Sequence, residues 1–345
     1  MRAVVIESLG THASVREVPD PVPAPRGVGV RVEATGVCRS DWHAWRGHDD
    51  GVVLPHVPGH ELAGTVAAVG ADVRRWAAGD RVTVPFVVAC GRCAVCRAGD
   101  AQVCPQQTQP GFTGWGSFAE LVALDEADTN LVRLPDGMDA VAAAALGCRF
   151  ATSYRALTGR ARVQPGEWLS VHGCGGVGLA AVMIGVALGA RVVAVDVSPA
   201  ALGLARSLGA EIAVPAGEDV AAAVVEVTGG GAHVSTDAFG SEQTCADSVR
   251  SLRRRGRQVQ IGLLPPVSGH PRVPMDRVIA YELDLLGSHG MAAADYPPML
   301  ELVATGALRP DRLVTRTIGL DELPAALAAL DGAAAAAGMT VGALA

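Results

Sequence analysis

The sequence contains no lysine, so all 28 of its basic side chains are arginine. Schiff-base chemistry on a lysine is therefore excluded, and with it the lysine-type aldolases and the pyridoxal phosphate enzymes. Positive charge is also scarce, since the formal net charge is −7 and the basic run is short, Arg253–Arg255. A mildly acidic chain has no general attraction for nucleic acid or an anionic membrane, so we expect neither as a partner. We expect the three arginines to lie in a solvent-exposed turn.

A secretory signal core is missing as well. The first residues, MRAVVIESLG, have no apolar core followed by a small-residue cleavage site and are typical of a first β-strand, so we expect a cytoplasmic protein. One stretch without charged residues, Trp168 to Ala190, approaches the length of a membrane span. It contains six glycines and is bounded by Glu167 and Arg191, which favours a strand, a glycine turn and a helix over a span.

The chain is long enough for two domains, because it has 345 residues and a hydrophobic fraction of 50%. Its first half is rich in short valine-containing runs broken by Gly, Pro and Asp, which predict an irregular, mostly β domain. These runs are Arg2–Glu7, Val28–Ala34, Leu62–Val69 and Arg81–Val84.

The middle of the chain changes to strands that alternate with helices, which predicts a parallel sheet covered on both faces. The predicted strands are Trp168–His172, Arg191–Asp196, Val234–Ala238 and Gln258–Ile261, and the predicted helices are Val177–Leu188 and Pro199–Leu208. We therefore expect an α/β protein in which residues 1–150 and 289–345 form one domain and residues 151–288 form the other. The alanine run Ala333–Ala337 is expected to lie at the end of a helix.

Four of the eight cysteines lie within the segment CGRCAVCRAGDAQVC. They are Cys90, Cys93, Cys96 and Cys104. Cys-x-x-Cys places two sulfurs around one ion across a tight turn, and four thiolates complete a tetrahedral zinc shell with no open position. This spacing predicts a structural zinc site. The alternative is a pair of disulfides, which a cytoplasmic location disfavours.

A second group of metal-binding residue types is spread over three segments, GVCRSDWH, VPGHELAG and LGCRFATSY. Each residue taken alone is more often structural, because a buried cysteine behaves as a small apolar side chain. Together, Cys38, His60 and Cys148 form a three-ligand set, which is the pattern of a catalytic zinc whose fourth position stays open to water or substrate. We interpret Cys174 and Cys245 as structural residues.

The segment VHGCGGVG holds Gly173, Gly175 and Gly178 in the spacing GxGxxG. A predicted strand precedes it, a helix follows, and the next strand ends at Asp196, which is the context of a dinucleotide-binding loop. The glycines would permit the tight turn, the approach of a pyrophosphate and close helix packing, and Asp196 would bind the adenosine ribose and disfavour a 2′-phosphate. We therefore predict NAD rather than NADP, with an unliganded strand–turn–helix as the alternative.

These motifs in this order resemble the zinc-containing alcohol dehydrogenases of the medium-chain dehydrogenase superfamily. GHELAGTVAAVG is similar to the GHE signature of that family, CRSDWH to the stretch after the first ligand, and the four-cysteine segment and GCGGVG follow at the family's positions. The resemblance implies a GroES-like catalytic domain and a Rossmann domain. It also implies reversible oxidation of a primary or secondary alcohol to an aldehyde or ketone with NAD⁺, two zinc ions per chain, and a homodimer or homotetramer.

Residue roles follow from the same resemblance. Cys38, His60 and Cys148 look like the ligands of the catalytic zinc, Asp41 like the carboxylate that orients His60, and Glu61 like a carboxylate beside the ion. Ser40 and His43 resemble the catalytic proton relay, with Ser40 touching the substrate oxygen. The implied cofactor-binding residues are Arg39, Thr152, Gly173, Gly175, Gly176, Val177, Gly178 and Asp196. Among these, Arg39 resembles a residue that contacts the pyrophosphate, and Thr152 one that packs on the nicotinamide.

Two departures from the family pattern concern the cofactor. Met339 stands where relatives often carry an arginine for the pyrophosphate, and the residues after Asp196, Val197–Ala201, lack the lysine that many relatives place near the ribose. Cofactor affinity is then weaker than in relatives, or another arginine takes these roles.

The substrate is less well specified than the reaction. Near the metal motifs lie Trp42, Trp45, Trp115 and Phe150, which either line an apolar pocket or belong to the ordinary core. Cys148 as third ligand separates the chain from polyol dehydrogenases, which tend to use glutamate there. A polyol, threonine or formaldehyde dehydrogenase remains the alternative enzyme, and a non-catalytic zinc and dinucleotide-binding protein the alternative of another class. A zinc-ribbon nucleic-acid binder rests on the four cysteines alone and conflicts with the acidic charge.

Overall fold

The computed structural model describes residues 1–264, 271–332 and 337–344. These residues form two units, one made of Met1–Ala151, Gly290–Ala304 and Val314–Ala345, and the other of Thr152–His289 and Thr305–Leu313. We call them unit 1 and unit 2. The short segment Thr305–Leu313, which the sequence placed with the first domain, clusters with unit 2. Most of the alanine run that was expected to end a helix, residues 333–336, lies outside the described residues.

A parallel sheet forms the centre of unit 2, as the alternating pattern predicted. In the described part of this unit, six strands lie in the order β10-β9-β8-β11-β12-β13, and every neighbouring pair is parallel. Their bounds are β8 Trp168–His172, β9 Arg191–Asp196, β10 Ile212–Pro215, β11 Ala232–Asp237, β12 Leu252–Gln260 and β13 Asp284–Gly287. The strand order reverses between β8 and β11, so the loop after β8 lies at the point where open α/β sheets bind ligands.

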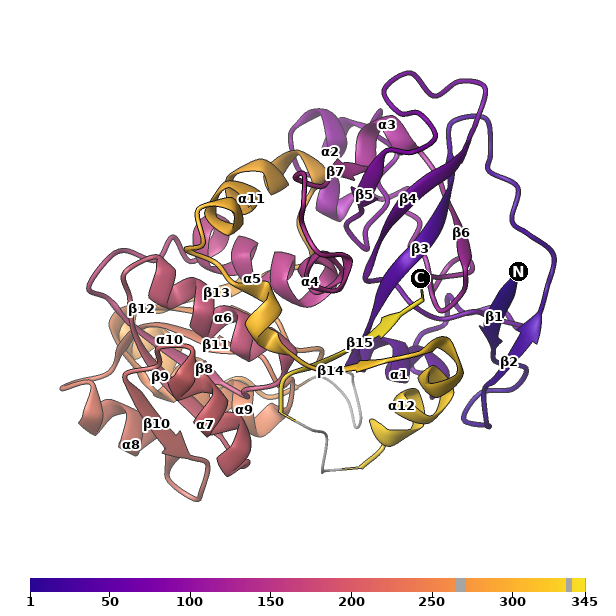
Figure 1. Ribbon diagram of the computed structural model, residues 1–345. Coiled ribbons are helices and arrows are strands. Elements are labelled where there is room, and N and C mark those ends of the chain that lie inside the picture. The colour runs from indigo at the N-terminus through magenta and orange to yellow at the C-terminus, as the bar shows by residue number, and fades with distance from the viewer. Residues whose placement is uncertain (265–270, 333–336, 345) are drawn as a thin grey trace. The chain divides into compact units, whose positions relative to one another are not determined.

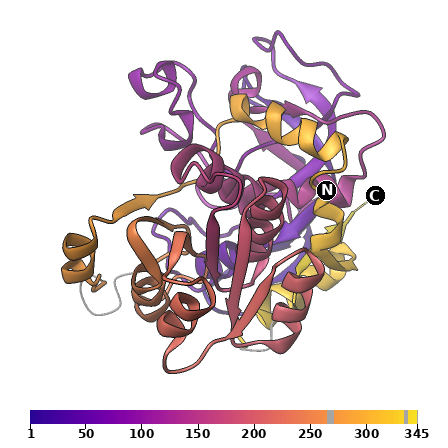
Figure 2. The same cartoon turned by 90° about the vertical axis from the view of Figure 1, so that its left-hand side faces the viewer.

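Helices cover both faces of this sheet (Figures 1 and 2). On one face α6 and α7 pack against β8, β9 and β10, and on the other α8, α9 and α10 pack against one another and the sheet. The helix bounds are α6 Gly176–Ala187, α7 Pro199–Ser207, α8 Val220–Val227, α9 Glu242–Arg250 and α10 Met275–Tyr281. Helix α7 begins where the sequence predicts, because the Ser198 side chain accepts a hydrogen bond from the backbone N–H of Ala201 and Pro199 takes the first position.

The three consecutive arginines are exposed, but they belong to strand β12 and not to a turn. The pairing register with β11 shifts between Leu252 and Arg257, so the residues between them form a bulge in the ladder. Arg255 adopts a positive φ of 62° within this bulge. The prediction of a turn was therefore wrong in element type, because a bulge produces the same local exposure inside a strand.

Unit 1 contains a mixed sheet in which valine-rich strands bury most of their side chains. In the described part of the unit, its seven strands include the path β14-β15-β3-β4-β5-β7, and β6 also pairs with β3. The pairs are antiparallel except β14 with β15. The bounds are β3 Val28–Val37, β4 Leu62–Val69, β5 Arg81–Thr83, β6 Leu121–Leu124, β7 Val132–Arg133, β14 Val314–Ile318 and β15 Met339–Ala343. Strands β1 (Arg2–Val5) and β2 (Ser14–Glu17) form a separate antiparallel pair.

Short helices fill the connections of unit 1. They are α1 Arg39–Trp45, α2 Ala94–Arg97, α3 Ala127–Asn130, α4 Ala140–Ala144, α11 Tyr296–Ala304 and α12 Leu323–Ala329, while α5, Ala151–Arg155, begins at the boundary with unit 2. Among the described residues, no helix is long and apolar enough to cross a membrane. The uncharged stretch that was tested for a span contains β8, the glycine turn and the twelve-residue helix α6.

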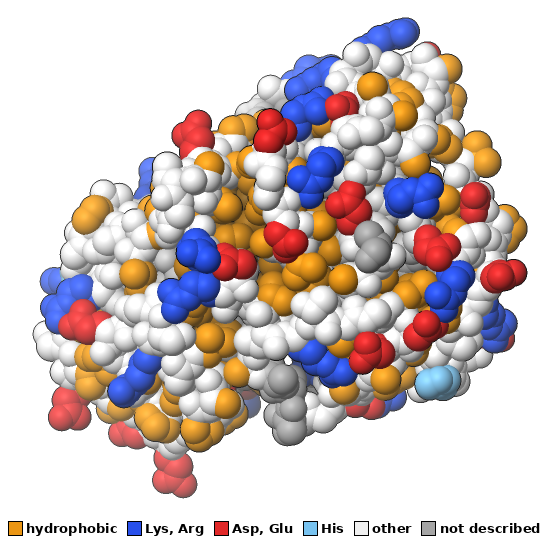
Figure 3. Space-filling view, viewed as in Figure 1, with side chains coloured by type: hydrophobic (Ala, Val, Ile, Leu, Met, Phe, Trp, Pro, Cys, Tyr) orange, Lys and Arg blue, Asp and Glu red, His pale blue; other side chains and the backbone are white. Residues whose placement is uncertain are grey.

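Charged side chains of both signs alternate over the face shown in Figure 3, and on the described residues of that face arginines lie close to acidic groups. Exposed ion pairs among the described residues include Arg2–Asp321 and Arg46–Asp331.

Candidate metal centres and cofactor loop

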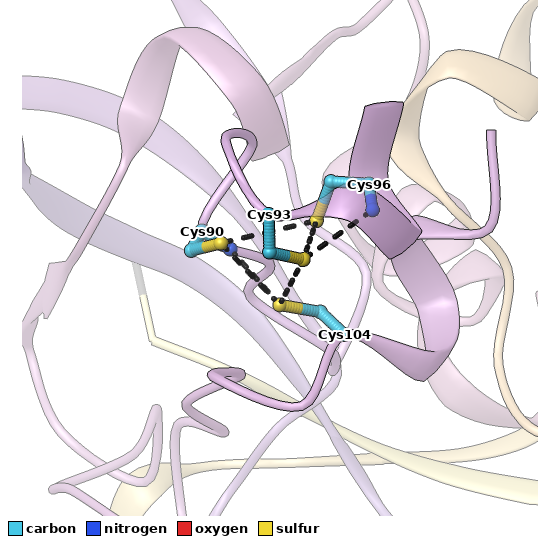
Figure 4. A group of neighbouring side chains, drawn as sticks. All are labelled: Cys90, Cys93, Cys96 and Cys104. Carbon is cyan, nitrogen blue, oxygen red and sulfur yellow. Dashed lines mark hydrogen bonds between the residues drawn. The ribbon is translucent and has the colours of Figure 1, made fainter. Parts of the chain in front are cut away.

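The four cysteines of the segment from Cys90 to Cys104 turn their sulfur atoms toward one point (Figure 4). The Sγ–Sγ distances are 3.4 Å for Cys93–Cys96, 3.6 Å for Cys90–Cys104, 3.8 Å for Cys93–Cys104 and 4.0 Å for Cys90–Cys96. A tetrahedron with Zn–S bonds of about 2.3 Å has edges of about 3.8 Å, so the spacing fits one zinc ion. All four thiols are free, so the disulfide alternative does not describe this segment.

Backbone groups prepare these sulfurs to carry negative charge. The N–H groups of Cys90, Cys96 and Gln106 point at sulfurs of the cluster, at N–S distances of 3.3 to 3.5 Å. The backbone N–H groups of Arg92 and Cys93 lower the pKa of Cys90 to about 6. Gly91 permits the turn with a φ of 71°, and a Cβ there would lie 2.4 Å from the Thr129 hydroxyl. If all four thiolates held one ion, no position would remain at this centre for substrate.

The dispersed residues also meet, inside unit 1, where Cys38, His60 and Glu61 are buried and Cys148 is partly buried. Donor atoms of Cys38, His60, Glu61 and Cys148 all lie within 4.8 Å of one another. Cys38 immediately precedes α1, His60 and Glu61 precede β4, and Cys148 lies in a π-helical turn, Leu146–Phe150. Three segments far apart in the sequence thus converge on one point, as the three-ligand hypothesis requires.

Asp41 orients His60 within this group. Its Oδ1 lies 2.8 Å from His60 Nδ1 and also accepts the backbone N–H of Gly59 at 3.1 Å. Its Oδ2 accepts the backbone N–H of Cys38 at 2.9 Å, so one buried carboxylate ties two of the three ligand segments together. The opposite ring nitrogen, His60 Nε2, is buried and has no hydrogen-bond partner. Buried polar atoms are nearly always satisfied, so this nitrogen has the environment of a metal ligand.

Ionisation of the ligands is coupled. Although burial opposes charge, the Asp41 carboxylate and the Cys38 sulfur raise the pKa of His60 well above its usual value. The hydrogen bond from the Cys148 thiol lowers the pKa of Cys38 well below its usual value, with help from His60 and Arg149. A metal must displace protons from this set, so its affinity depends on pH. Two sulfurs and one imidazole nitrogen are a donor set that fits zinc.

Glu61 is held by a residue that the sequence analysis did not identify. Arg149 donates its backbone N–H to Glu61 Oε1 at 2.9 Å, its Nε to both carboxylate oxygens at 3.0 Å, and its Nη2 to Oε2. Both side chains are buried, with 7% and 0% of their surface exposed. The sequence did contain a signal for this residue, because Arg149 is a charged residue next to Cys148 within the apolar stretch AAALGCRFA. A buried arginine requires a partner, so an acidic residue near the metal ligands could have been expected.

The residues expected to move a proton lie on α1. Ser40 Oγ is 3.7 Å from Cys38 Sγ, and His43, three residues further along, shares the same side of the helix. His43 Nδ1 lies 2.9 Å from Nδ1 of His48, a second residue not identified from the sequence. Burial, then the neighbouring His48 and Arg39, lower the pKa of His43. The exposed Arg39 stacks over Trp42, with its guanidinium carbon 4.9 Å from the ring centroid.

The aromatic side chains that adjoin His60 differ from those proposed from the sequence. Phe112 and Phe86 lie against it, with ring centroids 5.1 and 6.2 Å from the imidazole. Of the earlier candidates, Phe150 is fully buried and Trp45 packs in a core cluster with residues of β1, which favours the core alternative for both. Trp42 and Trp115 are partly exposed and hydrogen-bond to Asp331 and the carbonyl of Pro55.

Tyr296 is a further buried group that sequence reasoning missed. Its side chain on α11 is fully buried, and its hydroxyl has no hydrogen-bond partner. Burial, with Cys148 and Glu61 nearby, raises the pKa of this phenol, so it stays protonated. No pattern in the sequence joins position 296 to position 148.

The glycine loop of unit 2 has the geometry of a dinucleotide-binding turn. Gly173 has a φ of 90°, and a Cβ on Gly178 would lie 1.8 Å from the Gly173 carbonyl oxygen, so both positions require glycine. A Cβ on Gly175 would meet nothing within 4 Å, which leaves open space above the turn. Helix α6 begins at Gly176, followed by Val177, and directs its first backbone N–H groups toward that space.

Asp196 ends β9 beside this loop. Its Oδ2 accepts the backbone N–H of Cys174 at 2.6 Å and its Oδ1 that of Ser198 at 2.8 Å, so the carboxylate also braces the turn. Thr152 is buried at the start of unit 2, and its neighbour Ser153 donates to the carbonyl of Val177 at 2.9 Å. In unit 1, Met339 is fully buried in β15.

Two protein families match this chain. Residues 24–136 match the family described as alcohol dehydrogenase GroES-like domain, and residues 176–305 match the family described as zinc-binding dehydrogenase. The first match covers the four-cysteine segment, His60 and the residues of α1, and the second starts at the first residue of α6. These matches support the expected fold, a GroES-like domain joined to a Rossmann-like domain.

Individual relatives cover nearly the whole chain. An alcohol dehydrogenase from Geobacillus stearothermophilus is 34% identical over 315 residues, which is 90% of this chain and 90% of that protein. A solved NAD-dependent alcohol dehydrogenase superposes with a TM-score of 0.90 at 30% identity and covers 100% of both chains. A zinc-binding dehydrogenase from Sinorhizobium meliloti 1021, solved with NADP bound, has a TM-score of 0.88 at 30% identity and covers 99% of this chain and 98% of its own.

Proposed function

Because the chain belongs to the zinc-containing alcohol dehydrogenase family, we propose that it oxidises a primary or secondary alcohol reversibly to an aldehyde or ketone with NAD⁺. One observation supports this most directly: Cys38, His60 and Cys148 offer three donor atoms within 4.8 Å of one another, while the neighbouring Glu61 carboxylate is bound by Arg149. Three protein ligands and an open fourth position distinguish a catalytic zinc from a structural one.

Zinc bound there supplies a Lewis acid that acidifies an alcohol or polarises a carbonyl. The chain's own residues orient the site and move the proton. Asp41 fixes the ring of His60 and the backbone of Cys38, so the donors are aimed before substrate arrives. We assign the role of first proton acceptor to the hydroxyl of Ser40, which lies on α1 close to the Cys38 sulfur.

His43 continues the proton path toward water. Its lowered pKa keeps the imidazole neutral near pH 7, and a neutral imidazole can accept a proton. His48 is exposed and 2.9 Å away, which gives the proton a partner at the surface. The rate of alcohol oxidation therefore depends on His43 remaining neutral and falls when the pH drops through its pKa.

NAD supplies the acceptor for the hydride, and we assign its binding to unit 2. The N-terminus of α6, with Gly175, Gly176 and Val177, faces the open space where a pyrophosphate would be held. Asp196 would bind the ribose hydroxyls and repel a 2′-phosphate. Thr152 and Arg39 complete the proposed set. Because one solved relative holds NADP, the preference must be measured and cannot be carried over from the family.

We assign a second zinc ion, with a structural role, to the cluster of four cysteines.

The rings of Phe86 and Phe112 beside His60 favour an apolar alcohol over a sugar as the substrate. A polyol, threonine or formaldehyde dehydrogenase is the alternative. We further propose a small-molecule alcohol or aldehyde as the substrate, a homodimer or homotetramer as the assembly, and the cytoplasm as the location.

Metal analysis combined with an alcohol panel tests the proposal. The purified protein should hold two zinc ions per chain and form NADH from at least one alcohol, with lower turnover on NADP⁺. Cys148→Ser should lose one zinc and all activity, whereas Cys245→Ser, at a buried cysteine outside both clusters, should keep both. Full zinc content without turnover of any alcohol in the panel would contradict the proposed reaction.

A further inference from the structure

Glu61 is a potential fourth ligand of the dispersed metal centre. Its carboxylate belongs to the group whose donor atoms lie within 4.8 Å of one another, and a carboxylate oxygen is an accepted zinc ligand. Glu61 directly follows His60 in the chain, so the backbone that brings the His60 ligand to the ion also brings the Glu61 carboxylate close to it. If it bound the metal, the three-ligand centre would be closed to substrate.

Arg149 engages this carboxylate completely. Its backbone N–H and Nε reach Oε1, and its Nε and Nη2 reach Oε2, so each oxygen accepts at least two hydrogen bonds from one residue. The planar guanidinium matches the carboxylate geometry, and an ammonium group would not do so. Because Arg149 directly follows Cys148, the same turn that presents the third ligand also presents the partner of Glu61.

The surrounding backbone leaves Glu61 little freedom. A Cβ on Gly36 would lie 2.2 Å from Glu61 Oε2 and 2.9 Å from Arg149 Nη2, and a Cβ on Gly147 would lie 2.9 Å from Glu61 Cα. The ion pair therefore sits in a space that glycines on β3 and on the ligand turn create. Glu61 also has no exposed surface, so its carboxylate does not face bulk solvent.

We propose that Arg149 is a positioning residue that holds Glu61 out of metal coordination and so keeps the fourth position open for substrate. This inference rests on the proposed zinc centre at Cys38, His60 and Cys148. Arg149 touches neither substrate nor cofactor in this scheme and acts only through Glu61. Without the guanidinium, the buried carboxylate loses its three side-chain hydrogen bonds from Arg149, and binding to the metal would compensate for that loss.

Cobalt-substituted protein and imidazole as a probe test this directly. Cobalt(II) in a thiolate site absorbs visible light, and imidazole changes that spectrum only where it can enter the coordination sphere. The four-cysteine centre has no open position, so the difference spectrum reports the dispersed centre alone. Because imidazole binds as a neutral molecule, removal of the Arg149 charge does not by itself weaken its binding through lost electrostatic attraction.

Arg149→Gln should weaken imidazole binding to cobalt at least tenfold, because Glu61 then takes the open position. The double variant Arg149→Gln with Glu61→Gln should restore binding to within about threefold of the parent protein. Arg149→Lys, which retains the charge, should fall between them and serves if Arg149→Gln does not fold. Arg133→Gln, which breaks an exposed ion pair with Asp80 in the same unit, is the matched control and should change nothing.

Kinetics provide an independent measure. Competition between Glu61 and substrate raises KM for the alcohol more than it lowers kcat, and the double variant should recover KM. Parent-like imidazole binding in both Arg149→Gln and Arg149→Lys would overturn the inference, as would a double variant as weak as the single one. Failure of the parent protein to bind metal at Cys38, His60 and Cys148 would instead overturn the proposed function.

Discussion

His172 should make the sheet of unit 2 sensitive to acid. This residue ends β8, directly before the glycine loop, and is buried with Nε2 3.3 Å from the Ser251 hydroxyl. Burial lowers its pKa from 6.5 to about 4. In the native protein the ring therefore stays neutral at a pH where it would already be protonated in the unfolded chain.

The sign and size of the effect follow from proton linkage. Between pH 6.5 and 4 the unfolded state binds more protons than the native state, so stability is present above pH 6.5 and is lost as the pH falls through this window. One pKa unit corresponds to about 1.4 kcal/mol, which gives about 2.5 kcal/mol of lost stability at pH 4.5. That is a factor of about 70 in the equilibrium constant for opening the sheet.

Hydrogen–deuterium exchange of peptides from β8 and β9 measures this opening separately from unit 1. His172→Gln keeps a group able to hydrogen-bond with Ser251 but does not titrate. The protection of the variant relative to the parent should rise about 70-fold between pH 7 and pH 4.5. The control His289→Gln alters an exposed histidine of the same unit and should leave the ratio constant. A constant ratio for His172→Gln as well would refute the reasoning.

Three further outcomes test the proton path, the cofactor loop and the four-cysteine centre. Ser40→Ala should cut turnover about 100-fold with unchanged zinc content, and an unaffected rate would rule out the proton path through Ser40. Asp196→Gly should shift the NAD to NADP ratio of kcat/KM toward NADP by about tenfold, and unchanged selectivity would mean that Asp196 does not read the ribose. Cys104→Ser should remove one zinc ion and lower the melting temperature by roughly 5 °C, whereas retention of both ions would contradict the structural site.

Four of the six described strands of the unit 2 sheet, β8, β9, β11 and β12, were predicted from the sequence, whereas β10 and β13 were not. Strands β8 and β9 have the bounds that were expected, and α6 and α7 differ from the predictions by a single residue at their ends. Strand β8, the middle of β9 and most of α6 are buried and mainly apolar, so local composition and tertiary environment agree there. The bulge of β12 was not predictable, because the shift in register depends on two neighbouring strands rather than on the arginines themselves.

The candidate metal centres were likewise predictable only in part. The donors could be named from residue type and spacing, since few side chains bind zinc. Their supporting contacts could not, because Arg149 reaches Glu61 across 88 positions of sequence, and Tyr296 comes from α11, further still along the chain. His48 was nearer, five residues from His43, but a histidine in a polar loop carries no sign of its partner.

The two candidate zinc centres differ in what holds their ligands in place. Around the dispersed centre, Asp41 binds Cys38 and His60 through hydrogen bonds that exist without any ion, and Arg149 fixes Glu61 in the same way. In the four-cysteine segment the support comes from backbone N–H groups that point at the sulfurs, and the small apolar cluster around them consists of the ligand cysteines with Ala89 and Ala101. The backbone of the segment itself thus holds these sulfurs, whereas the side chains of Asp41 and Arg149 hold the dispersed centre. A site that exchanges substrate needs the second arrangement, since its ligands must stay in position while the fourth position changes occupant.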